Sequence, residues 1–331
     1  MKWLLTGPFG NIGAHVLAEL AARGHDLRCF DLPSKENVRA AQRWQRRHPI
    51  EVLWGDLRRE ADVAAAVRGC DAVIHLAFVI PKLSATGVDS ETRPEWAREV
   101  NVGGMLNLLA ALRALQPAPR LLFASSLHVF GPTQHQPPPR QVSDAVHPTE
   151  HYALHKVACE EMVKASGLPW AIFRLAASMP IRLILDRGLF DVPLANRIEY
   201  VHGKDVARAI ANALERPAAW GQTWLIGGGP ACQFYYRDLA ARVLDAFGVG
   251  MLPDHAFSTT PFATDWLDTS ESQRVLEFQR HTLADYVADV KRQLGPRRQA
   301  IQAVSPLVRA WLLRQSPYAR QMAAQPQPAF G

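Results

Sequence analysis

The sequence has 331 residues, of which 48% are hydrophobic and 21% are charged, with a net charge of +6 and a pI near 9.3. Its arginines are spread along the chain rather than gathered in a basic stripe with aromatic residues, which argues against nucleic-acid binding by a globular protein of this size. The first apolar run stops after three residues and no run approaches the roughly 18 residues of a membrane span, so we expect a cytoplasmic protein without a transmembrane segment.

Apolar runs of strand length alternate with helix-period segments through the first two-thirds of the chain. Strands without polar alternation, separated by amphipathic helices, indicate a parallel sheet covered on both faces. The sequence therefore predicts an α/β, doubly wound (Rossmann) sheet. Its strands are expected in KWLLTG, DLRCFD, EVLWGD, DAVIHLAFV, RLLFASS, PWAIFRLAA and TWLIGGG.

The later part of the chain predicts a small, mainly helical lobe. We expect the Rossmann domain in residues 1–176 and 201–229, and a substrate lobe in 177–200 and 230–295. Residues 296–331 form a basic, amphipathic tail. For this tail, packing on the domain or on a second subunit is favoured over a membrane-surface or partner helix.

A glycine-rich turn, TGPFGNIG, follows the first predicted strand and opens a helix. Glycines at such a junction let the backbone approach a pyrophosphate, whose charge is met by the N–H groups and the positive end of the helix. Asp31 ends the second predicted strand, where a carboxylate binds the ribose hydroxyls and repels a 2′-phosphate. This favours NAD over NADP, although Lys35 and Arg39 lie close by.

The stretch YALHK places Tyr152 and Lys156 on one face of a predicted helix, because side chains at i and i+4 lie on the same side. An ammonium near a phenol favours the phenolate and lowers its pKa. The pair is therefore a candidate proton-transfer catalyst, although a solvated surface pair has the same spacing.

Several segments, in this order, resemble the extended short-chain dehydrogenases/reductases of the NAD-dependent epimerase/dehydratase superfamily, over roughly residues 1 to 290. They are TGPFGNIG, Asp31, GDL at 55–57, HLA at 75–77, Asn101 in NVGGMLNLL, SSLHVFG at 125–131 and YALHK, followed by VHGKDVARAI and WLDTSESQRVLEF.

The resemblance implies a role for each matching position. Asp56 and Leu57 would flank the adenine, and Ala77 would lie against the nicotinamide ribose. Counting back from the glycine of SSLHVFG makes Ser126 the catalytic serine, and Asn101 would support a proton relay. The residues expected at the cofactor are Gly7, Phe9, Gly10, Asn11, Ile12, Gly13, Asp31, Asp56, Leu57, Leu76, Ala77, Phe78, Ala124, Lys156 and Leu175.

In such a site Tyr152 would remove the hydroxyl proton of an alcohol as its hydride leaves. Lys156 would lower the phenol pKa, together with the positive nicotinamide, and would hold the nicotinamide ribose. Ser126 would position the substrate oxygen. The resemblance also implies a homodimer, built on helices flanking the tyrosine helix.

Departures from the family pattern favour a small, apolar substrate over a nucleotide sugar. Leu127 and His128 replace the acid pair of the dehydratases, and Ala177 replaces a pyrophosphate-binding asparagine. The stretch between Ala177 and Val201 is too short to enclose a nucleotide. We expect the substrate to be bound by Val79, Ser126, His128, Tyr152 and Met179, with Phe78 and Leu183 as further lining candidates.

Alternatives remain open at three places. His128 could act as an additional acid or base, but pocket lining is favoured. His147, His151 and His155 recur at helical spacing, yet a proline and the lack of a completing carboxylate favour no metal. Arg174 could hold a substrate anion or form a structural salt bridge.

The predicted function is NAD-dependent interconversion of a secondary alcohol and its ketone. An NAD-retaining sugar epimerase and a catalytically silent dinucleotide-binding scaffold are the alternatives, because the fold hosts both.

Overall fold

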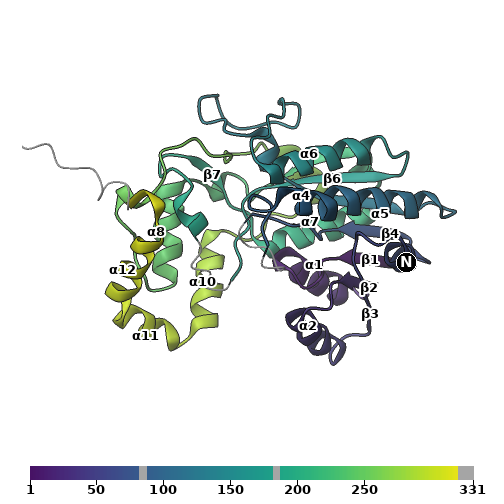
Figure 1. Cartoon of the computed structure of the whole chain (residues 1–331), viewed down its shortest axis with the longest axis horizontal. Helices are drawn as coiled ribbons and strands as arrows, with labels where there is room; N and C mark the ends of the chain where they lie inside the picture. Colours follow the sequence, from purple (N-terminus) through teal and green to yellow (C-terminus); the bar gives the residue numbers. More distant parts are fainter. Residues whose placement is uncertain (82–87, 182–186, 320–331) are drawn as a thin grey trace, which may run out of the picture.

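A seven-stranded parallel sheet forms the centre of the computed structural model, which describes residues 1–81, 88–181 and 187–319 (Figure 1). The strand order is β3-β2-β1-β4-β5-β6-β8, so the chain winds outward in both directions from β1. The prediction of a doubly wound sheet is confirmed. The strands are β1 (Lys2–Thr6), β2 (Asp26–Asp31), β3 (Ile50–Trp54), β4 (Ala72–His75), β5 (Arg120–Ser126), β6 (Trp170–Leu175) and β8 (Gln222–Ile226).

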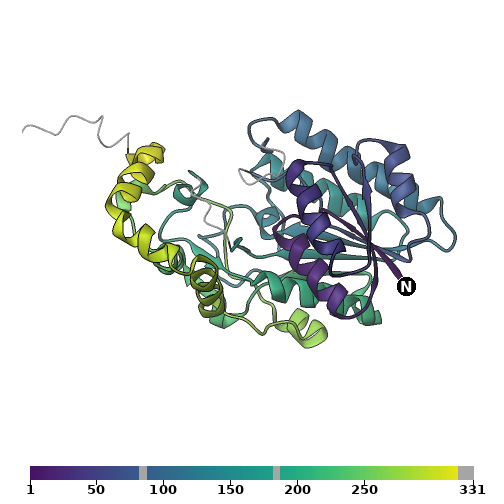
Figure 2. The same cartoon turned by 90° about the horizontal axis from the view of Figure 1, so that it is seen from below.

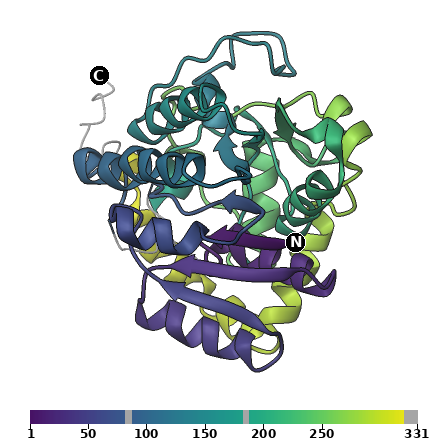
Figure 3. The ribbon, with the colours of Figure 1, turned by 90° about the vertical axis from the view of Figure 1, so that its right-hand side faces the viewer.

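Helices cover both faces of this sheet (Figure 3). Successive side chains of a strand point to opposite faces, so Trp3 and Leu5 enter one apolar cluster and Leu4 enters another. The first cluster is covered by α1 (Asn11–Ala22) and α7 (Gly203–Glu215), with α2 (Lys35–Gln45) beside them. The second is covered by α3 (Glu60–Val67), α5 (Gly104–Arg113) and α6 (His151–Lys164).

The segment from Pro94 to Arg113 reads as one helix in the sequence, but the structure interrupts it. α4 (Pro94–Arg98) passes into a π-helical turn (Glu99–Gly103) before α5 begins. Within that turn, the Asn101 side chain accepts from the Val79 N–H at 2.7 Å and donates to its carbonyl at 3.0 Å. Such a bulge commonly occurs at functional sites, and here it turns a buried amide toward the chain after β4.

A lobe of later helices stands at one end of the molecule, away from the N-terminal strand (Figures 1 and 2). Its third apolar cluster joins β7 (Arg197–Glu199), β9 (Gln233–Tyr235), α8 (Tyr236–Ala246) and α10 (Leu283–Leu294). α9 (Ser270–Leu276) instead packs on α7 and β8.

The described part of the tail packs on this lobe. It forms α11 (Arg297–Ala303) and α12 (Ser305–Gln315), and Leu312 is buried in the lobe core. The Ser316 hydroxyl donates to the Ala256 carbonyl at 2.6 Å. Leu307 and Trp311, on the outer side of α12, remain exposed. Among the described residues, no helix is both long and apolar enough to cross a membrane.

Gly13→Ala should destabilise the fold by about 1–3 kcal/mol, the usual cost of forcing an atom into a packed site. A Cβ at Gly13 would lie 2.0 Å from the Gly7 carbonyl oxygen, whereas a Cβ at Gly10 would find its nearest neighbour at 3.5 Å. Thermal unfolding without added NAD measures the difference, with Gly10→Ala as the control. Equal melting temperatures for the two variants would contradict the packing argument.

Candidate active site

A cavity of about 750 Å³ opens along the carboxyl edge of the sheet. Parallel strands direct their loops to this edge, which is where open α/β sheets bind ligands. The cavity runs from the glycine turn, past the ends of β5 and β6, to the start of α6. The predicted site residues that line it are Gly7, Phe9, Gly10, Asn11, Ile12, Gly13, Leu76, Phe78, Ala124, Ser126, His128, Tyr152, Lys156 and Leu175.

The glycine turn has the geometry of a dinucleotide cradle. Gly7 has φ of 68° and lies so close to Ala77 that a Cβ would be 2.9 Å from its backbone. The helix α1 begins after Gly10 with no side chain capping its N-terminus, so its first N–H groups remain available to an anion. These features fit the pyrophosphate of NAD.

Asp31 lies at the end of β2, next to this turn. Its carboxylate accepts a hydrogen bond from the Leu32 N–H at 2.8 Å. Burial raises the pKa of Asp31 to about 6, although backbone hydrogen bonds from Leu32 and Phe9 act in the opposite direction. The group is therefore ionised at neutral pH and can accept hydrogen bonds from ribose hydroxyls.

Asp56 and Leu57 lie beyond the residues that line the cavity. The Arg58 guanidinium donates to both carboxylate oxygens of Asp56, to Oδ1 at 3.1 Å and to Oδ2 at 2.6 Å, and holds the pKa of Asp56 below its usual range. Leu57 is buried against Gly104. Their predicted contacts with adenine stay a prediction.

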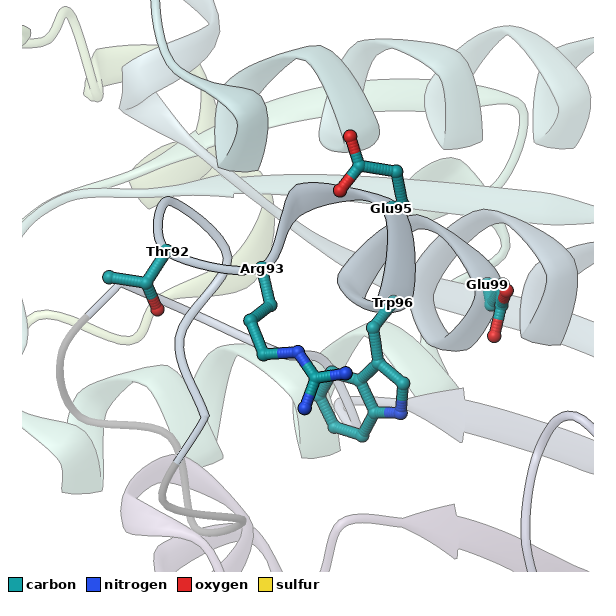
Figure 4. Close-up of a pocket in the computed structure, with 5 residues that line it drawn as sticks. All are labelled: Thr92, Arg93, Glu95, Trp96 and Glu99. Carbon is teal, nitrogen blue, oxygen red and sulfur yellow. The ribbon is translucent and has the colours of Figure 1, made fainter.

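A second hollow, of about 500 Å³, lies on α4 and is lined by Thr92, Arg93, Glu95, Trp96 and Glu99. In Figure 4 the Arg93 side chain lies beside the Trp96 indole. The Arg58 guanidinium also stacks over Trp96, 5.7 Å from its ring centroid. None of the predicted site residues lines this hollow, so it is separate from the proton-transfer pair.

Ser126 and Tyr152 meet at the end of β5. Ser126 ends the strand, Tyr152 stands in the first turn of α6, and both side chains line the cavity. Burial raises the pKa of Tyr152 to about 12, because it outweighs the opposing effect of the Ser126 hydroxyl, and Glu150 adds a negative charge nearby. The phenol is neutral in the surroundings that the protein alone provides.

Lys156 is buried beside Ala124 and Phe78. Its ammonium donates to the Ala124 carbonyl at 2.6 Å and lies 3.4 Å from the centroid of the Phe78 ring. It is 5.6 Å from the centroid of the Tyr152 ring, and burial lowers its own pKa to about 7. Desolvation dominates both side chains in the protein groups alone. The lowering of the phenol pKa by Lys156 together with the bound nicotinamide stays a prediction.

Arg174 is structural. It is buried and binds both carboxylate oxygens of Glu160, at 3.0 and 2.8 Å. Ser125 donates to the same carboxylate at 2.6 Å. Burial opposes ionisation of Glu160, yet these partners hold its pKa below the usual range. Of the two alternatives for Arg174, the structure shows the salt bridge. The Ser125 hydroxyl is hydrogen-bonded to the same carboxylate.

Asn101 links the chain after β4 to α6, through Val79 and His155. Its amide holds the Val79 backbone and lies 3.4 Å from Nδ1 of His155, which is buried. Within the described ranges, no three His, Cys, Asp or Glu side chains gather in a way that could hold a metal.

Two of the residues predicted to contact the substrate do not line the cavity, whereas a sequence neighbour of each one does. Val79 is buried, and Met179 packs against the lobe core, whereas the neighbouring Ile80 and Pro180 line the cavity. Leu183 lies outside the described residues.

Sequence reasoning missed Glu91. Its carboxylate accepts from the backbone N–H groups of His151, at 3.1 Å, and Tyr152, at 2.9 Å, and so caps the helix that carries the tyrosine. No local spacing signals this contact, because the two segments are far apart in the sequence.

The family model for the NAD dependent epimerase/dehydratase family matches residues 3–179, more than half of the chain. The protein belongs to the NAD-dependent epimerase/dehydratase family. This confirms the predicted family and NAD as the family's cofactor.

Curated relatives of this family member match only in part. A 3 beta-hydroxysteroid dehydrogenase/Delta 5-->4-isomerase of Mycobacterium tuberculosis is 40% identical over 109 residues, which are 33% of this chain and 27% of the relative. Human 3 beta-hydroxysteroid dehydrogenase type 7 is 32% identical over 50% of this chain and 45% of its own length. The CDP-paratose 2-epimerase of Salmonella typhi is 31% identical over 40% of this chain and 38% of its own length. The matches therefore span less than half of each of these relatives.

Solved structures of the epimerase type share the whole fold. A UDP-glucose-4-epimerase from Stenotrophomonas maltophila with bound NAD has a TM-score of 0.73 at 22% identity, covering 92% of this chain and 99% of that one. A short-chain dehydrogenase/reductase superfamily protein from Agrobacterium tumefaciens with bound NAD has a TM-score of 0.71 at 21% identity, covering 91% and 100%. At these identities the likeness shows the fold.

NAD affinity should fall as the pH drops through about 6, the raised pKa of Asp31. The ionised carboxylate accepts the ribose hydroxyls, and its population falls about tenfold for each pH unit below that value. Calorimetric titration with NAD between about pH 5 and pH 8 measures the change. Asp31→Asn should bind more weakly at neutral pH and lose this dependence, and a wild-type affinity that stays flat across the range would contradict the role of Asp31.

Proposed function

We propose that this protein interconverts a secondary alcohol and its ketone on a small, apolar, non-nucleotide substrate, with NAD as hydride carrier. The observation that carries the proposal is that Ser126, Tyr152 and Lys156 line one cavity together with the glycine turn. A silent scaffold has no need of a phenol in this position.

The chain's own residues would handle the proton and the oxygen. Bound NAD+ supplies the hydride acceptor and a positive charge. Ser126 would hold the substrate oxygen, and Tyr152 would take the hydroxyl proton. In the direction of reduction, Tyr152 returns that proton. The ammonium of Lys156 lies beside Ala124 on the floor of the cavity, where it can turn toward a ribose hydroxyl.

Apolar residues in the cavity lining support an apolar substrate. Ile80, Leu127 and Ile181 line the same cavity as Tyr152. The backbone of Ala177 is tied to β7 and its continuation, through hydrogen bonds with Glu199 and Val201, which keeps the connection after β6 short. The partial likeness to hydroxysteroid dehydrogenases also favours an apolar alcohol.

An NAD-retaining epimerase is the second candidate, favoured by the likeness to CDP-paratose 2-epimerase and to the epimerase structures. Release of NADH separates the two. The proposed dehydrogenase accumulates NADH with an alcohol, whereas an epimerase returns its hydride to the same substrate and accumulates none.

We also propose the predicted division into a Rossmann domain and a substrate lobe, and a homodimer. Leu106 on α5, a helix beside the tyrosine helix, is 54% exposed, and Leu154 on the tyrosine helix α6 is 48% exposed.

Tyr152→Phe should lower NADH formation by about 10²–10⁴-fold and leave NAD affinity unchanged, because the ring remains and only the acid–base group is lost. The assay follows NADH absorbance with a panel of apolar secondary alcohols that includes a 3-hydroxysteroid. Tyr235→Phe, at a half-exposed tyrosine, is the matched control. Wild-type-like turnover by the Tyr152 variant would refute the proposed function.

A further inference from the structure

The last part of the chain carries the whole excess of positive charge. After Asp289 the sequence holds seven of its 37 Lys and Arg residues and none of its 31 Asp and Glu residues. Basic residues occur throughout the chain, so the segment is set apart by its lack of acidic residues. The net charge of +6 therefore comes from this segment, and the rest of the protein is close to neutral.

Three helices of the lobe display this charge. The cations among the described residues are Lys291 and Arg292 on α10, Arg297 and Arg298 on α11, and Arg309 and Arg314 on α12. Arg292 pairs with Asp289, and Arg298 lies 3.7 Å from Asp245. Both acids precede the segment, which brings no carboxylate of its own, so the surface that these helices form stays positive.

The helix α12 has an apolar row on its outer side as well as on its inner side. Val308 and Leu312 face inward and pack on the lobe core. On the outer side, Leu307 is 74% exposed and Trp311 is 46% exposed. Val304, just before the helix, is 47% exposed and extends the row at the i, i+3 and i+7 spacing of one helical face. The inner side holds the helix in place, and the outer row adds nothing to that packing.

This basic, apolar surface lies at the edge of the molecule and next to the cavity. In Figures 1 and 2, α11 and α12 run along the outer edge of the lobe, away from the N-terminal strand. Gln293, between Arg292 and Arg297, is exposed and also lines the cavity. The surface therefore reaches the cavity opening.

We propose that α11 and α12, together with the end of α10, bind the surface of a bilayer that contains anionic lipids. The cations attract the negative headgroups. Val304, Leu307 and Trp311 enter the boundary between headgroups and acyl chains, where an indole places its apolar ring and its polar N–H favourably. The protein then lies on the membrane with its cavity opening beside it. The proposed alcohol oxidation neither requires this surface nor predicts it.

Charge and apolar exposure together favour a bilayer over other partners. A second copy of the same surface would bring two sets of cations together without acidic residues to balance them. A nucleic acid would neutralise the cations but would offer its phosphates to Val304 and Leu307. An anionic bilayer satisfies both the cations and the apolar row.

The test measures binding of the full chain to lipid vesicles. One set of vesicles is phosphatidylcholine, and the other contains about 30% phosphatidylglycerol to supply negative charge. Co-sedimentation gives the bound fraction at each lipid concentration, with and without about 0.5 M NaCl.

Two double variants separate the apolar row from the charge. Leu307→Ser with Trp311→Ser removes apolar side chains, and Arg297→Gln with Arg314→Gln removes two cations. All four positions are exposed, and melting temperatures check that the variants fold. The matched control is Val142→Ser with Arg274→Gln, at an exposed valine and an exposed arginine outside the segment.

We expect the wild type to bind the anionic vesicles at least about tenfold more tightly than the neutral ones, and salt to release it. Each double variant should lower binding to the anionic vesicles by about tenfold or more, and the control should match the wild type. NADH formation from a dissolved alcohol should be the same in all of them, because none of these residues lines the cavity. Failure of the proposed function would abolish NADH formation and leave vesicle binding intact.

Three results overturn the inference. The first is equal binding of the wild type to both kinds of vesicle. The second is binding that the two double variants weaken no more than the control does. The third is a wild type that binds no vesicles, whether sedimentation velocity shows that the apolar row joins two copies or titration with a DNA duplex shows that the cations hold nucleic acid.

Discussion

Desolvation in the first two turns of α6 is the constraint on which the site depends. Burial shifts the pKa of Tyr152 upward to about 12 and that of Lys156 downward to about 7, so each group is pushed toward its neutral form. The protein groups alone therefore do not prepare a phenolate. A positive charge arriving beside the phenol would favour its ionisation, which ties the proton transfer to the presence of the oxidised cofactor.

The first turn of α6 is held by contacts from several parts of the chain. Glu91 caps it, and Asn101 links the π-helical turn to the chain after β4 and to His155 on α6. One turn further on, Glu160 joins α6 to β5 and β6 through Ser125 and Arg174. Each buried polar group has a partner in these contacts, as is required where the dielectric is low. A rigid turn keeps the phenol at a fixed distance from Ser126, and fixed distance is what proton transfer needs.

The sequence predicted well what periodicity and local spacing encode. The seven strands follow from apolar runs, and the glycine turn follows from Gly7 and Gly13, whose neighbours leave no room for a side chain. The sequence predicted poorly the direction in which individual side chains point. The i and i+4 spacing put Lys156 on the face of Tyr152, but the ammonium turns to the Ala124 carbonyl, since a buried charge moves to the nearest acceptor. Val79 and Met179, expected at the substrate, are not among the residues that line the cavity, because Val79 is buried and Met179 packs against the lobe core.

The distribution of polar and apolar residues along the cavity indicates which part of a ligand binds where. Among the described lining residues, Glu36, Asn37 and Arg43 lie on α2, at the side of the glycine turn, where a dinucleotide presents its charged and hydroxylated parts. Ile80, Leu127 and Ile181 add apolar walls to the same cavity. A substrate rich in hydroxyls would leave them without partners against these walls, at a cost of about 1–3 kcal/mol for each buried group. An apolar molecule loses no hydrogen bonds against these walls, and its single oxygen would be bound by Ser126 and Tyr152. His128, whose Nδ1 lies 2.8 Å from Oε2 of Glu150, is a further polar group in the cavity lining.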